Sequence, residues 1–273
     1  MLCEICGGPA VHYFSKTFNA FNLKDVDYWR CEACGFVISR THQEMSSAAW
    51  SELNRQCHET YQGQAENVLD PRWKARLTAQ ASALAQLAGG GLLNPQGRWL
   101  DFGCGDGALS ALCADPYGLK LLKYDAYMPA GDDYLSGSAL TRGGFDFVIT
   151  TSVFEHLTRR SQWDDIEALV APRGVLGIHT LVAEQVPEDP NWFYLQAPHT
   201  AFFTNAAMAR LFQDWGYRAS IYSVAASLWL WFRSDPKEVQ AKMERINATT
   251  GSDFLFREGF LDYWKIDPRR PNT

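Results

Sequence analysis

The sequence lacks a long run of apolar residues. The longest candidate, residues 224–232, is far shorter than the roughly 20 residues that a helix needs to cross a bilayer. The first residues, Met1 to Glu4, have neither the basic start nor the apolar stretch of a secretory signal peptide. There is no internal repeat and no low-complexity tract. We therefore expect a cytoplasmic globular protein, and 273 residues are enough for one or two domains.

The sequence also lacks an excess of positive charge. It has 25 lysines and arginines against 31 aspartates and glutamates, so its formal net charge is −6. Residues 1–60 are acidic as well, with 5 basic and 7 acidic side chains. Binding to nucleic acid or to an anionic membrane usually depends on clustered positive charge. We therefore expect neither a membrane nor a nucleic acid as partner.

Seven cysteines are present, and four of them form two similar motifs. Without a secretory signal, such cysteines favour reduced thiols or metal ligation over disulfides. The spacing Cys-x-x-Cys-Gly, used twice, predicts one structural Zn²⁺ site, and the glycine permits the tight turn after each pair. A ribbon that binds nucleic acid is the alternative; a catalytic zinc fits poorly because four thiolates leave no open position. The predicted ligands are Cys3, Cys6, Cys31 and Cys34, and we expect Cys57, Cys104 and Cys113 to be free thiols.

The most informative motif is WLDFGCGDG at residues 99–107. An apolar lead ends at Asp101, and three glycines alternate after it before a helix-like ALSALCA stretch. Glycines at a strand-to-helix turn allow a sharp bend and let a ligand lie against the backbone, beside the free N–H groups of the helix. Open α/β sheets bind ligands at the carboxyl ends of their strands, where Asp101 would lie. The motif therefore predicts a cofactor site, and the carboxylate favours a cationic ligand.

Two classes of cofactor fit this loop. The run Gly103-x-Gly105-x-x-Ala108 matches the dinucleotide pattern, and Asp125 stands where a ribose-binding acid is expected. S-Adenosylmethionine also carries a ribose, so Asp125 does not distinguish the two. Asp101 does, because a carboxylate repels a pyrophosphate and attracts the ammonium group of a methionine moiety. The residues therefore favour S-adenosylmethionine, and a nicotinamide enzyme is the alternative.

Taken as D-x-G-x-G-x-G, this motif resembles the first motif of the class I S-adenosylmethionine-dependent methyltransferases. FDFVITTSVFEHL at residues 145–157 is similar to the fourth strand and following helix of that family, and APRGVLGIHT at residues 171–180 to its fifth strand. The resemblance covers about residues 70–233. It implies an α/β fold with a doubly wound, Rossmann-like seven-stranded sheet that ends in an antiparallel hairpin. It also implies cofactor-binding roles for Asp101, Gly103, Cys104, Gly105, Asp125 and Thr151.

The alternation of apolar and helical patterns after residue 97 agrees with such a sheet. We expect strands at residues 98–101, 120–124, 134–135, 145–150, 175–181, 218–224 and 228–233. We expect helices at residues 47–61, 72–88, 108–113, 153–157, 163–170, 205–215 and 236–246. The stretch between residues 125 and 145 is short, so the third strand is reduced relative to the family pattern.

We expect four parts along the chain. They are a zinc-binding ribbon at residues 1–40, a connector or lid at 41–70, the methyltransferase domain at 71–235, and a helical and aromatic extension at 236–273.

Two histidines are candidates for the acceptor side of the site. A hydroxyl or ammonium acceptor needs a base, and histidine suits that role near neutral pH. His199 lies on a loop after the fifth strand, with a proline before it and two phenylalanines after it. We predict that it acts as a base or orients the acceptor; bracing of the loop is the alternative. His156 follows Glu155 beside the crevice, where it is either catalytic or architectural. A further alternative is metal binding: Glu155, His156 and His199 resemble the divalent-metal ligands of methyltransferases that act on the 3′ ends of small RNAs, although Ser152 stands where that family has its first glutamate.

The sequence thus predicts methyl transfer from S-adenosylmethionine to a small-molecule acceptor. Resemblance to bacterial methyltransferases with a zinc module suggests a sugar or a biosynthetic intermediate, methylated at oxygen, nitrogen or carbon. One alternative is an RNA methyltransferase whose ribbon binds the substrate. Another is a non-catalytic interaction protein on the same scaffold, although the intact glycine motif argues against it.

Overall fold

The computed structural model describes residues 1–61, 72–127 and 133–263. Its internal contacts divide the chain into two compact units, and each unit collects segments that are far apart in the sequence. Unit 1 comprises Met1–Gln62, Ser152–Asp165 and Thr180–Leu211. Unit 2 comprises Gly63–Thr151, Ile166–His179 and Phe212–Thr273. The boundaries that we drew along the sequence remain a prediction, and residues 62–70 of the expected connector and 264–273 of the extension lie outside the described ranges.

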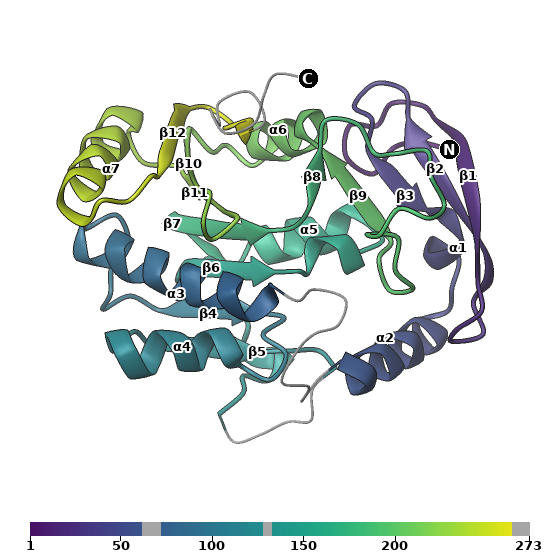
Figure 1. Cartoon of the computed structure of the whole chain (residues 1–273), viewed down its shortest axis with the longest axis horizontal. Helices are drawn as coiled ribbons and strands as arrows, with labels where there is room; N and C mark the ends of the chain where they lie inside the picture. The colour runs from purple at the N-terminus through teal and green to yellow at the C-terminus, as the bar shows by residue number, and fades with distance from the viewer. Residues whose placement is uncertain (62–71, 128–132, 264–273) are drawn as a thin grey trace. The chain divides into compact units, whose positions relative to one another are not determined.

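Unit 2 contains a seven-stranded mixed sheet in the order β12-β10-β11-β7-β6-β4-β5 (Figure 1). Strands β5, β4, β6 and β7 run parallel, whereas β11, β10 and β12 are joined by antiparallel pairs. The strands are β4 (Trp99–Phe102), β5 (Leu121–Tyr124), β6 (Phe145–Thr151), β7 (Val170–His179), β10 (Ala219–Ser223), β11 (Leu228–Phe232) and β12 (Leu255–Glu258). The predicted α/β class and the antiparallel hairpin β10–β11 are confirmed.

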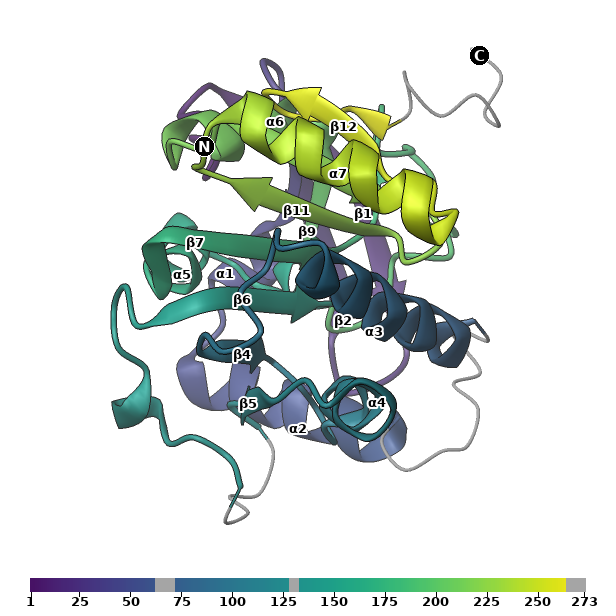
Figure 2. The same ribbon diagram turned by 90° about the vertical axis from the view of Figure 1, so that its left-hand side faces the viewer.

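Helices cover one face of this sheet because their apolar sides match its buried strands. In Figure 2, helices α3 (Trp73–Gly89), α4 (Ala108–Tyr117) and α7 (Pro236–Thr250) lie together on the same side of the strands. Leu84 and Leu87 of α3 are fully buried, in one apolar cluster with Ile149 and Leu230 of the sheet. Burial of such side chains stabilises the unit by about 1.5–3 kcal/mol for each residue.

The seventh strand is not the one that the sequence predicted. Tyr134 forms only an isolated bridge with Lys123, because the chain between β5 and β6 is too short for a full third strand and its helix. Strand β12, from the C-terminal segment, instead pairs with β10 at the other edge. The helix expected at residues 163–170 is α5 (Arg160–Glu167), and β7 begins earlier than expected because Val170 already pairs with Phe145.

Unit 1 contains a five-stranded sheet in the order β1-β2-β3-β9-β8. Its strands are β1 (Ala10–Phe18), β2 (Lys24–Cys31), β3 (Val37–Ser39), β8 (Val182–Ala183) and β9 (Ala201–Thr204). The first three form an antiparallel ribbon, and β9 extends it by pairing with β3. The sequence did not predict β8 and β9, because such short strands carry little periodicity of their own.

The remaining elements are short or peripheral to these sheets. They are α1 (Arg40–Gln43), α2 (Ser47–Tyr61), η1 (Gly137–Ala139), η2 (Phe154–His156) and α6 (Asn205–Asp214). Across the described ranges, each helix is too short or too polar to cross a lipid bilayer.

Candidate active site and metal centre

The glycine motif forms the turn between β4 and α4 of unit 2. Gly103, Gly105 and Gly107 have φ angles of 71°, 55° and 79°, in the left-handed region that disfavours side chains. A Cβ on Gly107 would lie 2.8 Å from Cδ of Lys123, so this position also lacks the space for one. The turn therefore needs glycine for its backbone, as the sequence predicted, and it leaves backbone N–H groups at the start of α4.

Strand β5 and the residues after it hold this turn in place. The N–H groups of Gly103 and Cys104 both donate to the carbonyl of Tyr124, at 2.7 and 3.1 Å. The N–H of Gly105 donates to Oδ2 of Asp125 at 2.9 Å. On the other side, the hydroxyl of Tyr134 donates to the carbonyl of Gly105 at 2.8 Å.

Asp101 is a buried carboxyl beneath this turn, with only 1% of its surface exposed. The Ser110 hydroxyl donates to its Oδ2 at 3.3 Å, and its Oδ1 has no hydrogen-bond partner among the described residues. Burial raises the pKa of Asp101 to about 7, and the nearby Asp125 charge adds to the shift. A buried acceptor without a partner is costly, so this site favours a ligand that brings a donor or a positive charge.

The other predicted cofactor residues lie on the same edge of the sheet. Both Asp125 oxygens accept backbone N–H groups, because Oδ1 also bonds Tyr127 at 2.9 Å. Thr151 ends β6, one residue beyond the pair that Thr150 forms with Phe102 of β4. Cys104 is half-buried in the turn, and burial raises the pKa of its thiol. These residues fit a cofactor with a ribose and an ammonium group.

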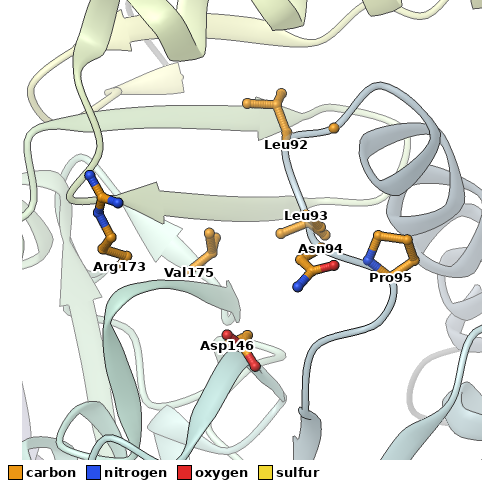
Figure 3. Close-up of a pocket in the computed structure, with 8 residues that line it drawn as sticks. Leu92, Leu93, Asn94, Pro95, Asp146, Arg173 and Val175 are labelled. Atoms are coloured by element: carbon orange, nitrogen blue, oxygen red, sulfur yellow. The ribbon is translucent and has the colours of Figure 1, made fainter.

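A pocket of about 350 Å³ lies at the opposite, amino ends of the parallel strands (Figure 3). Asn94 and Pro95 line it just before β4, with Asp146 near the start of β6 and Arg173 in β7. Ligands of open α/β sheets bind at the carboxyl ends of the strands, so this pocket is separate from the glycine turn.

The four predicted zinc ligands meet in unit 1. Sγ of Cys3 lies 3.7 Å from Sγ of Cys34, and Sγ of Cys6 lies 3.4 Å from Sγ of Cys31. All four sulfur atoms are within 4.8 Å of one another. A tetrahedral zinc with bonds of about 2.3 Å separates its sulfur ligands by about 3.8 Å, so this cluster has the size of such a site.

The backbone around the cysteines also suits a metal. Gly7 and Gly35 follow the second cysteine of each motif with φ angles of 72° and 71°. The N–H of Ile5 points to Sγ of Cys3 at 3.4 Å. The Cys34 thiol hydrogen-bonds to Cys3 and thereby lowers the pKa of Cys3 to about 5, while the pKa of Cys34 rises. None of the seven cysteines forms a disulfide, which agrees with the expected free thiols.

Glu155, His156 and His199 form a second cluster in unit 1. One potential ligand atom from each lies within 4.8 Å of the others, and the two imidazole rings stand edge to face with centroids 4.9 Å apart. Glu155 is 1% exposed and His199 is 7% exposed. The sequence already grouped these three residues as a possible metal-binding set, and the structure brings them together.

The hydrogen bonds of this cluster define its chemistry. Nδ1 of His199 lies 2.8 Å from the carbonyl of Tyr194, which can only accept, so Nδ1 carries a proton and Nε2 keeps a lone pair. Burial lowers the pKa of His199, and the negative charge of Glu155 opposes that shift. The Tyr194 hydroxyl donates to Oε1 of Glu155 at 2.7 Å, and Oε2 has no partner among the described residues.

Sequence reasoning missed three residues of these sites. Tyr194 contacts Glu155 through its hydroxyl and His199 through its carbonyl, and no local pattern marks either contact. Tyr134 was placed on a strand rather than over the glycine turn. Glu4 accepts a hydrogen bond from the N–H of Arg160, 156 residues away, and no local pattern could have revealed that contact.

Comparison with known proteins identifies the family. The profile of a family described as a methyltransferase domain matches residues 72–220, which is more than half of the chain. The chain belongs to this family and is a class I S-adenosylmethionine-dependent methyltransferase, hence an enzyme. No curated protein matches the sequence of this chain.

Several solved structures resemble the chain at low identity. An S-adenosylmethionine-dependent methyltransferase of Thermotoga maritima, described as a possible histamine N-methyltransferase, is 14% identical with a TM-score of 0.38, covering 68% of this chain and 100% of its own. Magnesium protoporphyrin IX methyltransferase of Synechocystis, with bound S-adenosylhomocysteine, is 21% identical with a TM-score of 0.44. The match covers 66% of this chain and 94% of that one. Human N-acetylserotonin methyltransferase with S-adenosylmethionine is 15% identical with a TM-score of 0.43. The match covers 70% of this chain and 57% of that one.

Proposed function

We propose that this enzyme methylates a small-molecule acceptor, a sugar or a biosynthetic intermediate, with help from His199. The observation that carries the proposal is the Glu155–His156–His199 cluster, in which Glu155 and His199 are buried and the neutral His199 imidazole has an Nε2 that is able to accept a proton. Because His199 is 7% exposed, an acceptor group that reaches it must be narrow.

The cofactor is held by the glycine turn in this proposal. S-Adenosylmethionine supplies, when bound, a methyl group on a positively charged sulfur. The Asp125 carboxylate, oriented by two backbone N–H groups, also accepts the ribose hydroxyls. Asp101 offers its unpartnered Oδ1 to the ammonium group. Gly103, Cys104, Gly105 and Thr151 supply the surface against which the cofactor lies.

His199 acts on the acceptor in this proposal. Its Nε2 takes the proton from a hydroxyl or ammonium group as that group becomes the nucleophile. The bond from Nδ1 to the Tyr194 carbonyl keeps the ring in the required tautomer and orientation. His156, next to it, orients the acceptor or supports the cluster, and the negative charge of Glu155 stabilises the imidazolium that forms.

A structural zinc ion bound by Cys3, Cys6, Cys31 and Cys34 completes the proposal. Four thiolates saturate a tetrahedral zinc, so the metal would stabilise the ribbon and leave no position for a substrate. Residues 1–60 carry more acidic than basic side chains, which disfavours RNA binding by this ribbon.

A transfer assay tests the function. The protein is incubated with S-adenosylmethionine labelled on its methyl group and with pools of nucleotide sugars, cofactor precursors and RNA. We expect label in a small molecule and a loss of labelling in His199→Ala. Label in RNA alone would favour the alternative substrate, and transfer to none of the pools would contradict the proposed acceptor classes.

A further inference from the structure

The two cysteine motifs of unit 1 contact more than each other. We call residues 3–7 the first knuckle and residues 31–35 the second knuckle. Two other segments of the same unit carry the acceptor-side cluster: residues 154–160 contain Glu155 and His156, and residues 199–204 contain His199. Each knuckle is bonded to one of these segments.

The first knuckle holds the segment that follows His156. Oε2 of Glu4 accepts the backbone N–H of Arg160 at 2.9 Å, and the Arg160 guanidinium donates to the carbonyl of Ile5 at 2.9 Å. Oε1 of Glu4 accepts from Nε2 of Gln43 at 2.9 Å, and the same nitrogen donates to the carbonyl of Thr158 at 2.8 Å. The Glu4 side chain is only 18% exposed, so these charge-assisted bonds are largely sheltered from water.

The second knuckle holds the segment that follows His199. The Thr204 hydroxyl donates to the carbonyl of Cys34, and the backbone of Gly35 approaches Thr204 so closely that a Cβ there would lie 3.1 Å from its methyl carbon. Beyond the knuckle, β3 pairs with β9, and the N–H of Ser39 donates to the carbonyl of Thr200 at 2.7 Å.

The two segments meet next to the cluster itself. The N–H of Thr200 donates to the carbonyl of Glu155 at 2.7 Å, and its hydroxyl donates to the carbonyl of Leu157, also at 2.7 Å. Glu155 itself carries the first of these carbonyls, and His199 directly precedes Thr200. Their separation therefore depends on how the two segments are held, and the knuckles hold both.

We propose that Glu4 and Thr204 are positioning residues that link the four-cysteine metal site to the Glu155–His156–His199 cluster. The inference deepens the proposed function and rests on it, because it needs zinc at the cysteines and an acceptor at the histidines. Zinc–sulfur bonds fix the two knuckles relative to each other. Glu4 and Thr204 carry that constraint to the segments on which the histidines lie, as supporting bonds do around other functional groups.

The chain offers a matched control for Glu4. Glu32 follows the first cysteine of the second knuckle, as Glu4 follows that of the first. Glu32 is exposed, and its carboxylate forms no hydrogen bond or ion pair with any residue that the structure describes. E4Q and E32Q thus make the same chemical change at equivalent places in the two knuckles, and only E4Q weakens the link to Arg160.

The experiment compares the histidine side chains of these variants in the zinc-loaded, full-length protein by NMR. Carbon-13 in the histidine rings gives one signal for each residue, and single histidine substitutions assign them. His179 lies in unit 2 and serves as the internal reference. We expect E4Q and T204V to shift the signals of His156 and His199 but not that of His179, and E32Q and T204S to leave all three unchanged.

The same samples are tested for zinc content and for S-adenosylmethionine affinity. We expect zinc to be retained and the affinity to change by less than roughly twofold, because the variants lie outside the glycine turn. Should E4Q lose its zinc, Q43L removes part of the same link without changing a knuckle, and the same shifts are expected of it. With an acceptor in hand, kcat should fall at least about tenfold while KM for the cofactor stays constant.

The outcomes separate this inference from the function on which it rests. Identical histidine spectra in wild type, E4Q and E32Q would overturn the link while leaving zinc and cofactor binding intact. Equal shifts in E4Q and E32Q would also overturn it, since the effect would then come from the loss of charge. A wild-type protein without zinc, or without affinity for S-adenosylmethionine, would instead contradict the proposed function itself.

Discussion

The carboxylate of Asp125 accepts a hydrogen bond from the backbone N–H of Gly105 at 2.9 Å, and so joins the end of β5 to the glycine turn. The residue that we propose to bind the ribose thus already shapes the turn of the proposed cofactor site. Asp125→Ala removes both contributions, whereas Asp125→Asn retains one acceptor oxygen.

Asp125→Ala should weaken S-adenosylmethionine binding by roughly 1.5–3 kcal/mol, because a charged acceptor of the ribose hydroxyls is lost. Asp125→Asn keeps the shape and one acceptor oxygen, so its loss should be smaller. Isothermal calorimetry measures both, with Asp115→Ala on the exposed side of α4 as control. Unchanged affinity in Asp125→Ala would place the ribose elsewhere.

Binding of S-adenosylmethionine should strengthen as the pH rises towards 7. The pKa of Asp101 in the free enzyme is about 7, and an ammonium group binds its ionised form better. Below that pH, binding must release a proton, which corresponds to roughly tenfold in affinity for each pH unit. Calorimetry at about pH 5.5, 6.5 and 7.5 tests this. An affinity of the wild type that does not change with pH would rule out the contact between Asp101 and the ammonium group.

Asp101→Asn should stabilise the free enzyme above neutral pH while it weakens cofactor binding. The folded state raises the pKa of Asp101 from 3.8 to about 7, so the stability that this group contributes is complete below pH 3.8 and is lost as the pH rises through about 7. The wild type should therefore lose stability relative to the variant over this window, by an amount on the order of a few kcal/mol. Chemical denaturation at both ends of the window measures the difference. A constant difference between the two proteins would show that Asp101 does not titrate as stated.

The purified protein should contain about one zinc ion per chain. Cys31→Ser combined with Cys34→Ser should abolish zinc binding and lower the stability of unit 1, because the metal joins the two knuckles. Cys57→Ala, which removes a cysteine outside the cluster, should keep the metal. Elemental analysis measures the zinc content of each protein. Zinc retained by the double variant would refute the assignment of the four cysteines as its ligands.

His199→Ala should lower turnover by roughly 10²–10⁴-fold and leave cofactor affinity almost unchanged, as expected for a positioned base. His156→Ala should reduce stability or cofactor binding if its role is architectural. His12→Ala, at an exposed histidine of the ribbon, is the control for loss of an imidazole. Steady-state kinetics with the acceptor found in the labelling screen gives the comparison, and full activity in His199→Ala would remove it from the mechanism.

Nucleic acid should bind only weakly and without specificity at physiological salt. Both the whole chain and residues 1–60 carry more acidic than basic side chains, so few phosphates are neutralised on contact. A fluorescence anisotropy titration with RNA, repeated at two salt concentrations, measures this. Submicromolar affinity that falls steeply with salt would promote the RNA methyltransferase alternative.

Local motifs carried most of what the sequence predicted correctly. The turn at Gly103–Gly107 could be predicted because backbone conformation demands glycine there whatever surrounds it. The clustering of the four cysteines could be predicted because two Cys-x-x-Cys pairs have the spacing that structural zinc sites use. The short stretch after Asp125 indicated a reduced third strand, but nothing local indicated that Leu255–Glu258 would supply another strand at the opposite edge.

The sequence by itself determined the family, the glycine turn and the two cysteine pairs, since each depends on residues close together in the chain. Only the tertiary structure decided that β9 would extend the ribbon, that Thr200 would bond to Glu155, and that Glu4 would bond to Arg160. These contacts join segments separated by more than forty residues, and their partners are selected by packing and by the need to pair buried polar groups. Neither influence leaves a periodic pattern in the sequence.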